Sequence, residues 1–294
     1  MSRTKSRAAT SFARPSRAEV LSAGNKRLRD VIAPGLKVLF CGINPGLYSA
    51  ATGNHFARPG NRFWPALHQS GFTPRLLHPS EKDALLRAGY GLTNLVGRAT
   101  ASAEELTPAE FVAGRRRLAA KLRRYRPEVV AFLGVGAYCH AFGHQRVVIG
   151  PQPARFEGAQ VWVLPSPSGL NANYQMPQLV KLFLRLRSCV ESESVDADLR
   201  VAIAGRRLVS FELDGVPRVG EPHDYGVRRG VPTLFFWQTG GESKSGRPLG
   251  WRLAALGKVS RLRLLEARFS GSRPAPSGRH IEWDELYASV SKRG

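Results

Sequence analysis

Cysteine and long apolar runs are both scarce in this chain of 294 residues. The three cysteines, Cys41, Cys139 and Cys189, include no Cys-x-x-Cys pair, so neither a disulfide framework nor a zinc knuckle is indicated and a reducing compartment is expected. The longest apolar runs, residues 129–136 and 161–165, fall far short of the roughly 18 residues that a membrane span needs. We therefore expect a cytoplasmic protein without a membrane segment.

Acidic residues are half as frequent as basic ones. Against 44 Lys+Arg stand 22 Asp+Glu, which gives a formal net charge of +22. With 43% hydrophobic residues the composition is that of a folded protein, which excludes disorder throughout the chain. The basic surplus favours a polyanionic partner. Much of it gathers on one expected helix, residues 108–125, which starts at a Thr107/Glu110 capping box: Arg115, Arg116, Arg117, Lys121, Arg123, Arg124 and Arg126.

The pattern along the chain predicts two domains and an arm. Residues 1–27 are rich in Ser, Arg and Ala, and we expect a disordered basic arm that either tethers DNA or only aids solubility. Residues 28–190 form the larger domain. The acidic, polar stretch 191–198 is typical of a linker, and residues 199–294 follow as a small β-rich domain.

The larger domain has the alternation of an α/β fold. Three apolar runs, residues 37–41, 129–133 and 161–164, predict buried parallel strands. Helical stretches separate them, at residues 63–70, 80–88, 108–125, 137–142 and 177–189. This alternation predicts a central, mostly parallel sheet with helices on both faces. In such sheets ligands bind at the carboxyl ends of the strands.

Two unusual loops follow two of these strands. Gly42-Ile43-Asn44-Pro45-Gly46 follows the first strand, and residues 165–170, Pro-Ser-Pro-Ser-Gly-Leu, follow the third. Asn44 offers a polar amide, and its flanking glycines allow a ligand to approach the backbone closely. Either loop alone would be an ordinary turn, but together they face one crevice.

Aromatic and basic residues alternate in the segment His55-Phe56-Ala57-Arg58-Pro59-Gly60-Asn61-Arg62-Phe63-Trp64. Such a pattern is typical of a surface that stacks bases and pairs with phosphates. We expect Phe63 and Trp64 to be core residues and Phe56 to be the stacking candidate.

Other chemistries find little support. Cys41 ends an apolar strand with no nearby His, so we expect a buried residue rather than a nucleophile, and Ser168 lacks the Gly-x-Ser-x-Gly elbow of serine hydrolases. His223 has no second His at metal-ligand spacing. We expect no metal and no cofactor.

Three runs carry a family resemblance: GLKVLFCGINPGLYSAATGNHFARPGNRFW, GLTNLVGRAT and VWVLPSPSGLNANY. Together, over roughly residues 28–190, they resemble the mismatch-specific uracil-DNA glycosylases, the group that includes thymine-DNA glycosylase. The resemblance implies the three-layer fold of that family and a monofunctional hydrolase. Such an enzyme flips uracil opposite guanine out of duplex DNA and cleaves its N-glycosidic bond, leaving an abasic site. Thymine and ethenocytosine are further possible bases, and the partner is double-stranded DNA with a U:G or T:G mismatch.

The resemblance also assigns roles. Asn44 matches the asparagine that positions the attacking water, Phe56 the residue on which the base stacks, and Asn94 a pocket position where some relatives have lysine. Backbone groups of Gly42 and Ile43 would read the uracil edge. Ser168, Gly169 and Leu170 would form a wedge that meets the opposite strand. Arg58 and Arg62 would contact DNA phosphates. Ser166 and residues 171–173 depart from the relatives, where Asn and an arginine are common.

The last hundred residues have a β pattern. We expect strands at residues 201–204, 208–213 and 233–238, with turns at Asp214-Gly215 and at residues 228–230. The runs FELDGVPRVGEPHDYG and GGESKSGRPLGWRLAALGKVSRLRLLEARF resemble WYL-type ligand-sensing domains. Five residues would form either a solvated surface with one packed tryptophan or a patch for an anionic ligand or nucleic acid: Arg218, Glu221, His223, Trp251 and Arg252.

Three functional hypotheses follow. The first is the glycosylase, a monomer in the nucleoid-associated cytoplasm of a bacterium. The second is a non-catalytic protein that binds DNA lesions or senses a ligand, and Asn44 together with Phe56 and the wedge argues against it. The third is a member of the wider fold that acts on another base or on single strands.

Overall fold

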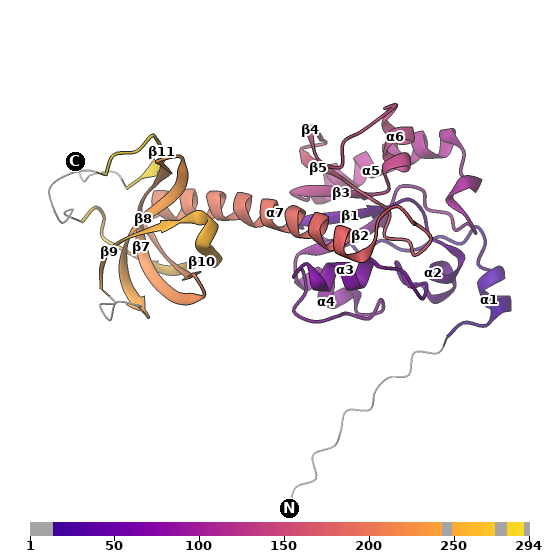
Figure 1. Cartoon of the computed structure of the whole chain (residues 1–294), viewed down its shortest axis with the longest axis horizontal. Coiled ribbons are helices and arrows are strands. Elements are labelled where there is room, and N and C mark those ends of the chain that lie inside the picture. The colour runs from indigo at the N-terminus through magenta and orange to yellow at the C-terminus, as the bar shows by residue number, and fades with distance from the viewer. Residues whose placement is uncertain (1–13, 243–248, 274–280, 291–294) are drawn as a thin grey trace, which may run out of the picture. The chain divides into compact units, whose positions relative to one another are not determined.

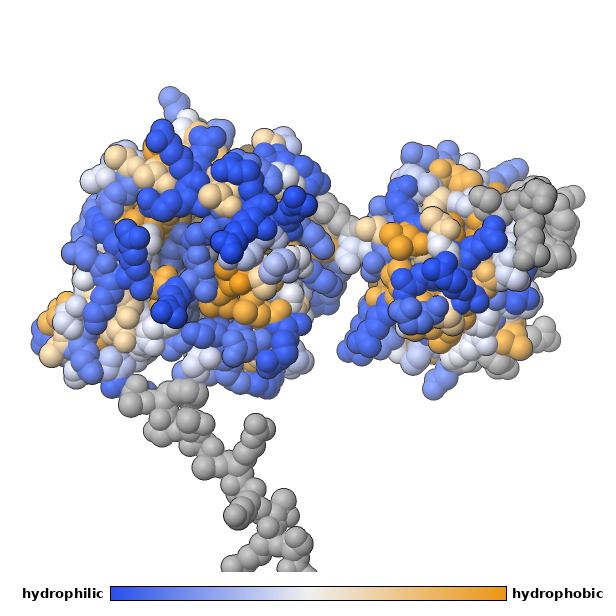
Figure 2. Space-filling view, turned by 180° about the vertical axis from the view of Figure 1, so that it is seen from behind, coloured by the Kyte–Doolittle hydropathy of each residue, from blue (hydrophilic) through white to orange (hydrophobic). Residues whose placement is uncertain are grey.

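The computed structural model describes residues 14–242, 249–273 and 281–290. The chain divides into two compact units, Met1–Val190 and Glu191–Gly294 (Figure 1). Hydrophilic residues cover most of the face of each unit that is seen in Figure 2, with apolar residues exposed between them. Within the described residues, we find no helix that combines the length and the apolar character needed to cross a bilayer.

The first unit is built on a five-stranded sheet in the order β2-β1-β3-β5-β4. Four strands are parallel and β4 runs antiparallel at the edge. The three strands expected from apolar runs are confirmed as β1 (Val38–Gly42), β3 (Val129–Leu133) and β5 (Ala159–Leu164). The other two are β2 (Tyr90–Asn94) and β4 (Gly150–Phe156).

Helices cover both faces of this sheet and make three layers (Figure 1). Phe63, Leu85 and Phe183 pack against one face, and Phe111, Leu118 and Tyr138 pack against the other. The first face carries α3 (Phe63–Gln69), α4 (Lys82–Arg87) and the start of α7 (Met176–Ala204). The second carries α5 (Pro108–Tyr125) and α6 (Val135–Phe142). The α/β fold expected from the alternating pattern is therefore confirmed.

Helix α5 starts at the expected capping box, in which the Glu110 N–H donates to the Thr107 hydroxyl and the Thr107 N–H donates to the Glu110 carboxylate. Its basic residues do not form one free surface. Lys121 lies 2.6 Å from Asp30, and Arg123 lies 2.7 Å from Glu157. At least these two charges on the helix therefore serve the fold.

The expected disordered arm is wrong for residues 16–27, whereas residues 1–13 lie outside the described residues. Helix α1 (Arg17–Leu21) starts at a capping box between Ser16 and Glu19. Ala23 is fully buried, the Asn25 N–H donates to the Ala99 carbonyl, and the Ala99 N–H donates to the Lys26 carbonyl. Burial and paired backbone groups order this segment in spite of its polar composition.

The predicted linker at residues 191–198 is also wrong in conformation, because it lies inside α7. Arg200 pairs with Asp196 one helical turn away, at 3.0 Å. Leu199, Ala202 and Ile203 recur at helical spacing and are buried in the core of the second unit, so residues 201–204 are helical rather than a strand.

The second unit is a six-stranded antiparallel sheet in the order β10-β6-β7-β8-β9, with β11 paired to β7. Both expected turns are confirmed. Asp214 and Gly215 have φ of 50° and 77°, and Arg229 and Gly230 have 51° and 73°, as in type I′ hairpin turns. The strands are β6 (Arg207–Leu213), β7 (Val216–Arg228), β8 (Val231–Gly241), β9 (Gly250–Ala255), β10 (Val259–Arg268) and β11 (Glu285–Ser289). The short helix η2 (Leu256–Lys258) lies in the second unit. In the first unit, α2 (Leu47–Thr52) follows β1, and η1 (Ala103–Glu105) precedes α5.

The expected solvated patch of the second unit is wrong, because Arg218, Glu221 and His223 are buried. The Glu221 carboxylate accepts two hydrogen bonds from Arg273, at 2.6 and 2.9 Å. The His223 ring lies 4.7 Å from the Trp251 ring. A ligand for this patch stays a prediction, as does the WYL resemblance, of whose runs residues 243–248 lie outside the described residues.

Candidate active site

A cavity of about 380 Å³ lies at the carboxyl ends of β1, β2 and β5. The structure brings most of the predicted site residues to its wall: Ile43, Asn44, Phe56, Arg58, Asn94, Ser168 and Leu170. Gly42, Arg62 and Gly169 do not line it, but each contacts a residue or loop that does.

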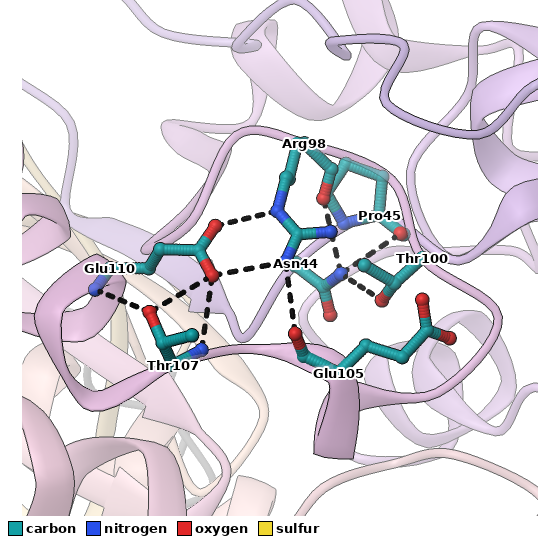
Figure 3. Close-up of polar contacts among 7 residues, drawn as sticks. All are labelled: Asn44, Pro45, Arg98, Thr100, Glu105, Thr107 and Glu110. Atoms are coloured by element: carbon teal, nitrogen blue, oxygen red, sulfur yellow. Dashed lines mark hydrogen bonds and ion pairs between the residues drawn. The ribbon is translucent and has the colours of Figure 1, made fainter.

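The Asn44 amide is held by the loop that follows β2 (Figure 3). Its Nδ2 donates to the Thr100 hydroxyl at 2.6 Å, the Arg98 carbonyl at 3.1 Å and the Pro45 carbonyl at 3.3 Å. Carbonyl oxygens only accept hydrogen bonds, so these partners fix the nitrogen end of the amide. Among the described residues Oδ1 has no hydrogen-bond partner, and it is left as an acceptor at the cavity.

Phe56 has a strained backbone, with φ of +54°, which is uncommon for a bulky residue and is often found at functional sites. Its ring stacks on Phe63 at a centroid distance of 4.3 Å and also lines the cavity. Trp64 Nε1 donates to the His55 carbonyl at 3.1 Å, which ties this segment to α3. Phe63 and Trp64 are buried, as expected.

Asn94 is oriented by a buried histidine. His55 Nε2 lies 3.0 Å from the Arg29 carbonyl, so this nitrogen carries the proton. Burial lowers the pKa of His55 from its ordinary value, which keeps the ring neutral and leaves Nδ1 as an acceptor for Asn94 Nδ2 at 3.5 Å. Asn94 Oδ1 then faces Gly42, where a Cβ atom would stand only 2.6 Å away.

The wedge loop is fastened by Arg62, which differs from the expected phosphate contact. The Arg62 guanidinium donates to the carbonyls of Ser168 at 2.5 Å and Asn171 at 2.8 Å, and to that of Tyr174. A Cβ on Gly169 would stand 2.6 Å from the Gly60 carbonyl, so the two loops pack closely. Leu170 is 74% exposed at the cavity. Arg58 is exposed and stays a candidate for phosphates.

Sequence patterns missed part of the site. Leu28, the first residue of the expected larger domain, lines the cavity, and so do Thr100 and residues 101–104. Thr100 stands inside the run GLTNLVGRAT, but no local signal ties it to Asn44, 56 residues away. Ser49 also lines the cavity.

Cys41 is confirmed as a core residue. Burial raises the pKa of its thiol to about 12, so it holds no thiolate near neutral pH.

Comparison with known proteins gives a family and a solved structure to which this chain is similar. A model of the family described as the uracil DNA glycosylase superfamily matches residues 29–187, more than half of the chain. Among solved structures, the chain is similar to the solution NMR structure of a proposed uracil DNA glycosylase from Methanosarcina acetivorans. The sequence identity is 18% and the TM-score 0.37, over 55% of this chain and 98% of that one. By its family match, the chain belongs to the uracil DNA glycosylase superfamily.

Proposed function

We propose that the protein is a monofunctional uracil-DNA glycosylase that removes uracil opposite guanine from duplex DNA. The observation that carries this proposal is the Asn44 amide, which is fixed at Nδ2 by three acceptors while Oδ1 is left at the cavity. An acceptor held in this way orients a water molecule through one of its protons and directs the water oxygen at the sugar carbon.

The reaction follows from the weak basicity of an amide. Because Asn44 cannot take a proton from water, the bond between C1′ of the sugar and N1 of uracil breaks well ahead of water attack. The base leaves as an anion, the water oxygen bonds to C1′, and the proton of the water goes to solvent or to the base. The products are free uracil and an abasic site.

Base selection is assigned to Asn94, Phe56 and the Ile43 N–H. Asn94 Oδ1 is an acceptor and suits the N3–H of uracil or thymine, whereas cytosine presents an acceptor at N3 and is disfavoured. The Ile43 carbonyl already accepts from the Val96 N–H at 2.9 Å, so only the Ile43 N–H remains for a carbonyl of the base. Phe56 supplies the stacking surface.

The partner strand is assigned to the wedge. Leu170 is an exposed leucine on a fastened loop, which suits a side chain that fills the space left by a flipped base. Main-chain groups of residues 168–170 would read the unpaired guanine. Arg58 would pair with a phosphate next to the lesion.

The test is strand cleavage of duplex oligonucleotides that carry one U:G, T:G or U:A pair, beside single-stranded uracil, with and without alkali. We expect breaks only after alkali, strongest for U:G, and none with Asn44→Ala. Breaks without alkali would contradict the monofunctional assignment. Tight binding without cleavage of any substrate would favour the alternative, a non-catalytic protein that recognises lesions.

A further inference from the structure

Arg98 contacts Asn44 without lining the cavity. Its backbone carbonyl accepts from Asn44 Nδ2 at 3.1 Å, and Thr100, two residues on, accepts from the same nitrogen. This segment lies between β2 and η1, and its backbone pairs with residues 25–27 and with Pro45 and Gly46. The Arg98 side chain adds a further attachment, to the start of α5.

The Arg98 side chain is held by the start of α5 (Figure 3). Nε and Nη2 donate to the two carboxylate oxygens of Glu110, at 2.5 and 3.0 Å, and Nη2 also donates to the Glu105 carbonyl at 2.9 Å. The Glu110 carboxylate accepts in addition from the Thr107 N–H, as the second half of the capping box. The bonds from Arg98 and Thr107 lower the pKa of Glu110 to about 2, so the carboxylate stays ionised at any working pH.

We propose that Arg98 and Glu110 are positioning residues, which transmit the fixed start of α5 through the Arg98 carbonyl to the Asn44 amide and thereby set the rate of base excision. This inference rests on the proposed function. Both side chains are about a third exposed, so the ion pair contributes little to folding stability. Its contribution is geometric, since a displacement of a reacting group by about 1 Å can slow catalysis by about two orders of magnitude.

The chain offers a matched control pair, Arg75 and Glu81. Two hydrogen bonds join them at 2.6 and 2.9 Å. Glu81 also accepts the N–H of the residue three positions earlier, His78, and these bonds likewise lower its pKa to about 2. Glu81 does not line the cavity. Glu81→Gln therefore removes an equivalent ion pair and leaves Asn44 untouched.

The test compares Glu110→Gln, Arg98→Lys and Glu81→Gln in single-turnover excision with enzyme in excess. Gln keeps the capping contact of Glu110 but loses the charge, and Lys keeps the charge of Arg98 but loses the paired geometry. We expect the excision rate constant to fall about 10- to 100-fold in the first two variants, with unchanged affinity for U:G duplex and unchanged melting temperature. We expect no change in Glu81→Gln.

A second readout follows the Asn44 amide itself by NMR, with its side-chain signals assigned from their loss in Asn44→Ala. The Nδ2 protons should exchange faster with solvent in Glu110→Gln than in wild type or Glu81→Gln. Equal rates in Glu110→Gln and Glu81→Gln, or an unchanged amide signal, would overturn the positioning role. Excision by neither wild type nor variant would instead overturn the proposed function, while the amide signal would still test the positioning.

Discussion

At the scale of single residues, the chemistry of the site depends on which polar atoms remain available for substrate or water once the hydrogen bonds within the protein are made. Asn44 uses Nδ2 on three acceptors and keeps Oδ1, and Asn94 uses Nδ2 on His55 and also keeps Oδ1. The Arg62 guanidinium donates its hydrogen bonds to carbonyls of the wedge loop and of Asn171. Two amide acceptors therefore meet in one cavity, which suits a reaction in which the base departs first.

Asn44→Ala tests the first of these acceptors. We expect excision to fall by roughly two orders of magnitude or more, because the attacking water loses the group that positions it. The affinity for duplex DNA should change little, because most affinity comes from phosphate contacts that Asn44 does not make. Gel-shift titration beside the cleavage assay measures both. A parallel loss of binding would contradict the assigned role.

His55 gives a prediction on pH. Because burial lowers its pKa in the folded protein, the unfolded chain binds the proton more readily, and the stability that His55 contributes is full above pH 6.5 and falls as the pH drops below it. Protonation would also turn Nδ1 into a donor and release Asn94. Nitrogen-15 NMR of the ring should show the Nε2–H tautomer with a midpoint below 6.5. An Nδ1–H tautomer or a higher midpoint would contradict this.

At the scale of elements, the wedge loop is positioned by a neighbouring loop rather than by a helix or strand. The Arg62 N–H donates to the Pro167 carbonyl at 2.9 Å, and Gly169 packs against Gly60. Gly169→Ala would force these loops apart, since the added Cβ meets a backbone oxygen at 2.6 Å. We expect excision to slow about tenfold or more as Leu170 shifts. The matched variant Gly257→Ala, where a Cβ meets nothing within 4 Å, should leave the rate unchanged.

Helices and strands could be predicted where the residues of the segment itself determine its conformation. The strands β1, β3 and β5 are continuous buried apolar runs, and the capping box of Thr107 and Glu110 marks the start of α5. Strand β4 was missed because most of its residues are exposed or only partly buried at the sheet edge. The acidic composition of residues 191–198 is typical of a linker, whereas their helix is fixed by burial of Leu199 and Ile203, which composition does not show.

The residues of the candidate site also divide into those with a local sequence signal and those that only long-range contacts bring together. Asn44, Phe56 and Leu170 stand in loops with their own Gly and Pro signals, and the family resemblance makes them candidates; the structure places all three at the cavity. The link from Glu110 through Arg98 to Asn44 joins segments that are 12 and 54 residues apart, and only the folded chain shows it.

At the scale of the whole molecule, residues outside the family match help to build the site. The match begins at residue 29, yet Leu28 lines the cavity, and Asn25 and Lys26 pair with Ala99 next to the loop that holds Asn44. Removal of residues 1–28 should slow excision about tenfold or more through loss of that loop's position. Removal of residues 1–13, which keeps all these contacts, should not. Equal activity of the two truncations would contradict this.

The second unit should be dispensable for excision. Among the residues that the structure describes, none that lines the cavity lies beyond Asn171, and none in the two cores of the first unit lies beyond Val190. Residues 1–190 also hold 27 of the 44 Lys+Arg and 9 of the 22 Asp+Glu, so most of the positive charge stays with the first unit. The truncated chain 1–190 should therefore excise uracil at a rate within about threefold of the full chain, with a nearly unchanged salt dependence of DNA binding. A truncated chain that melts cooperatively and binds DNA but does not cut would show that the second unit takes part in the chemistry.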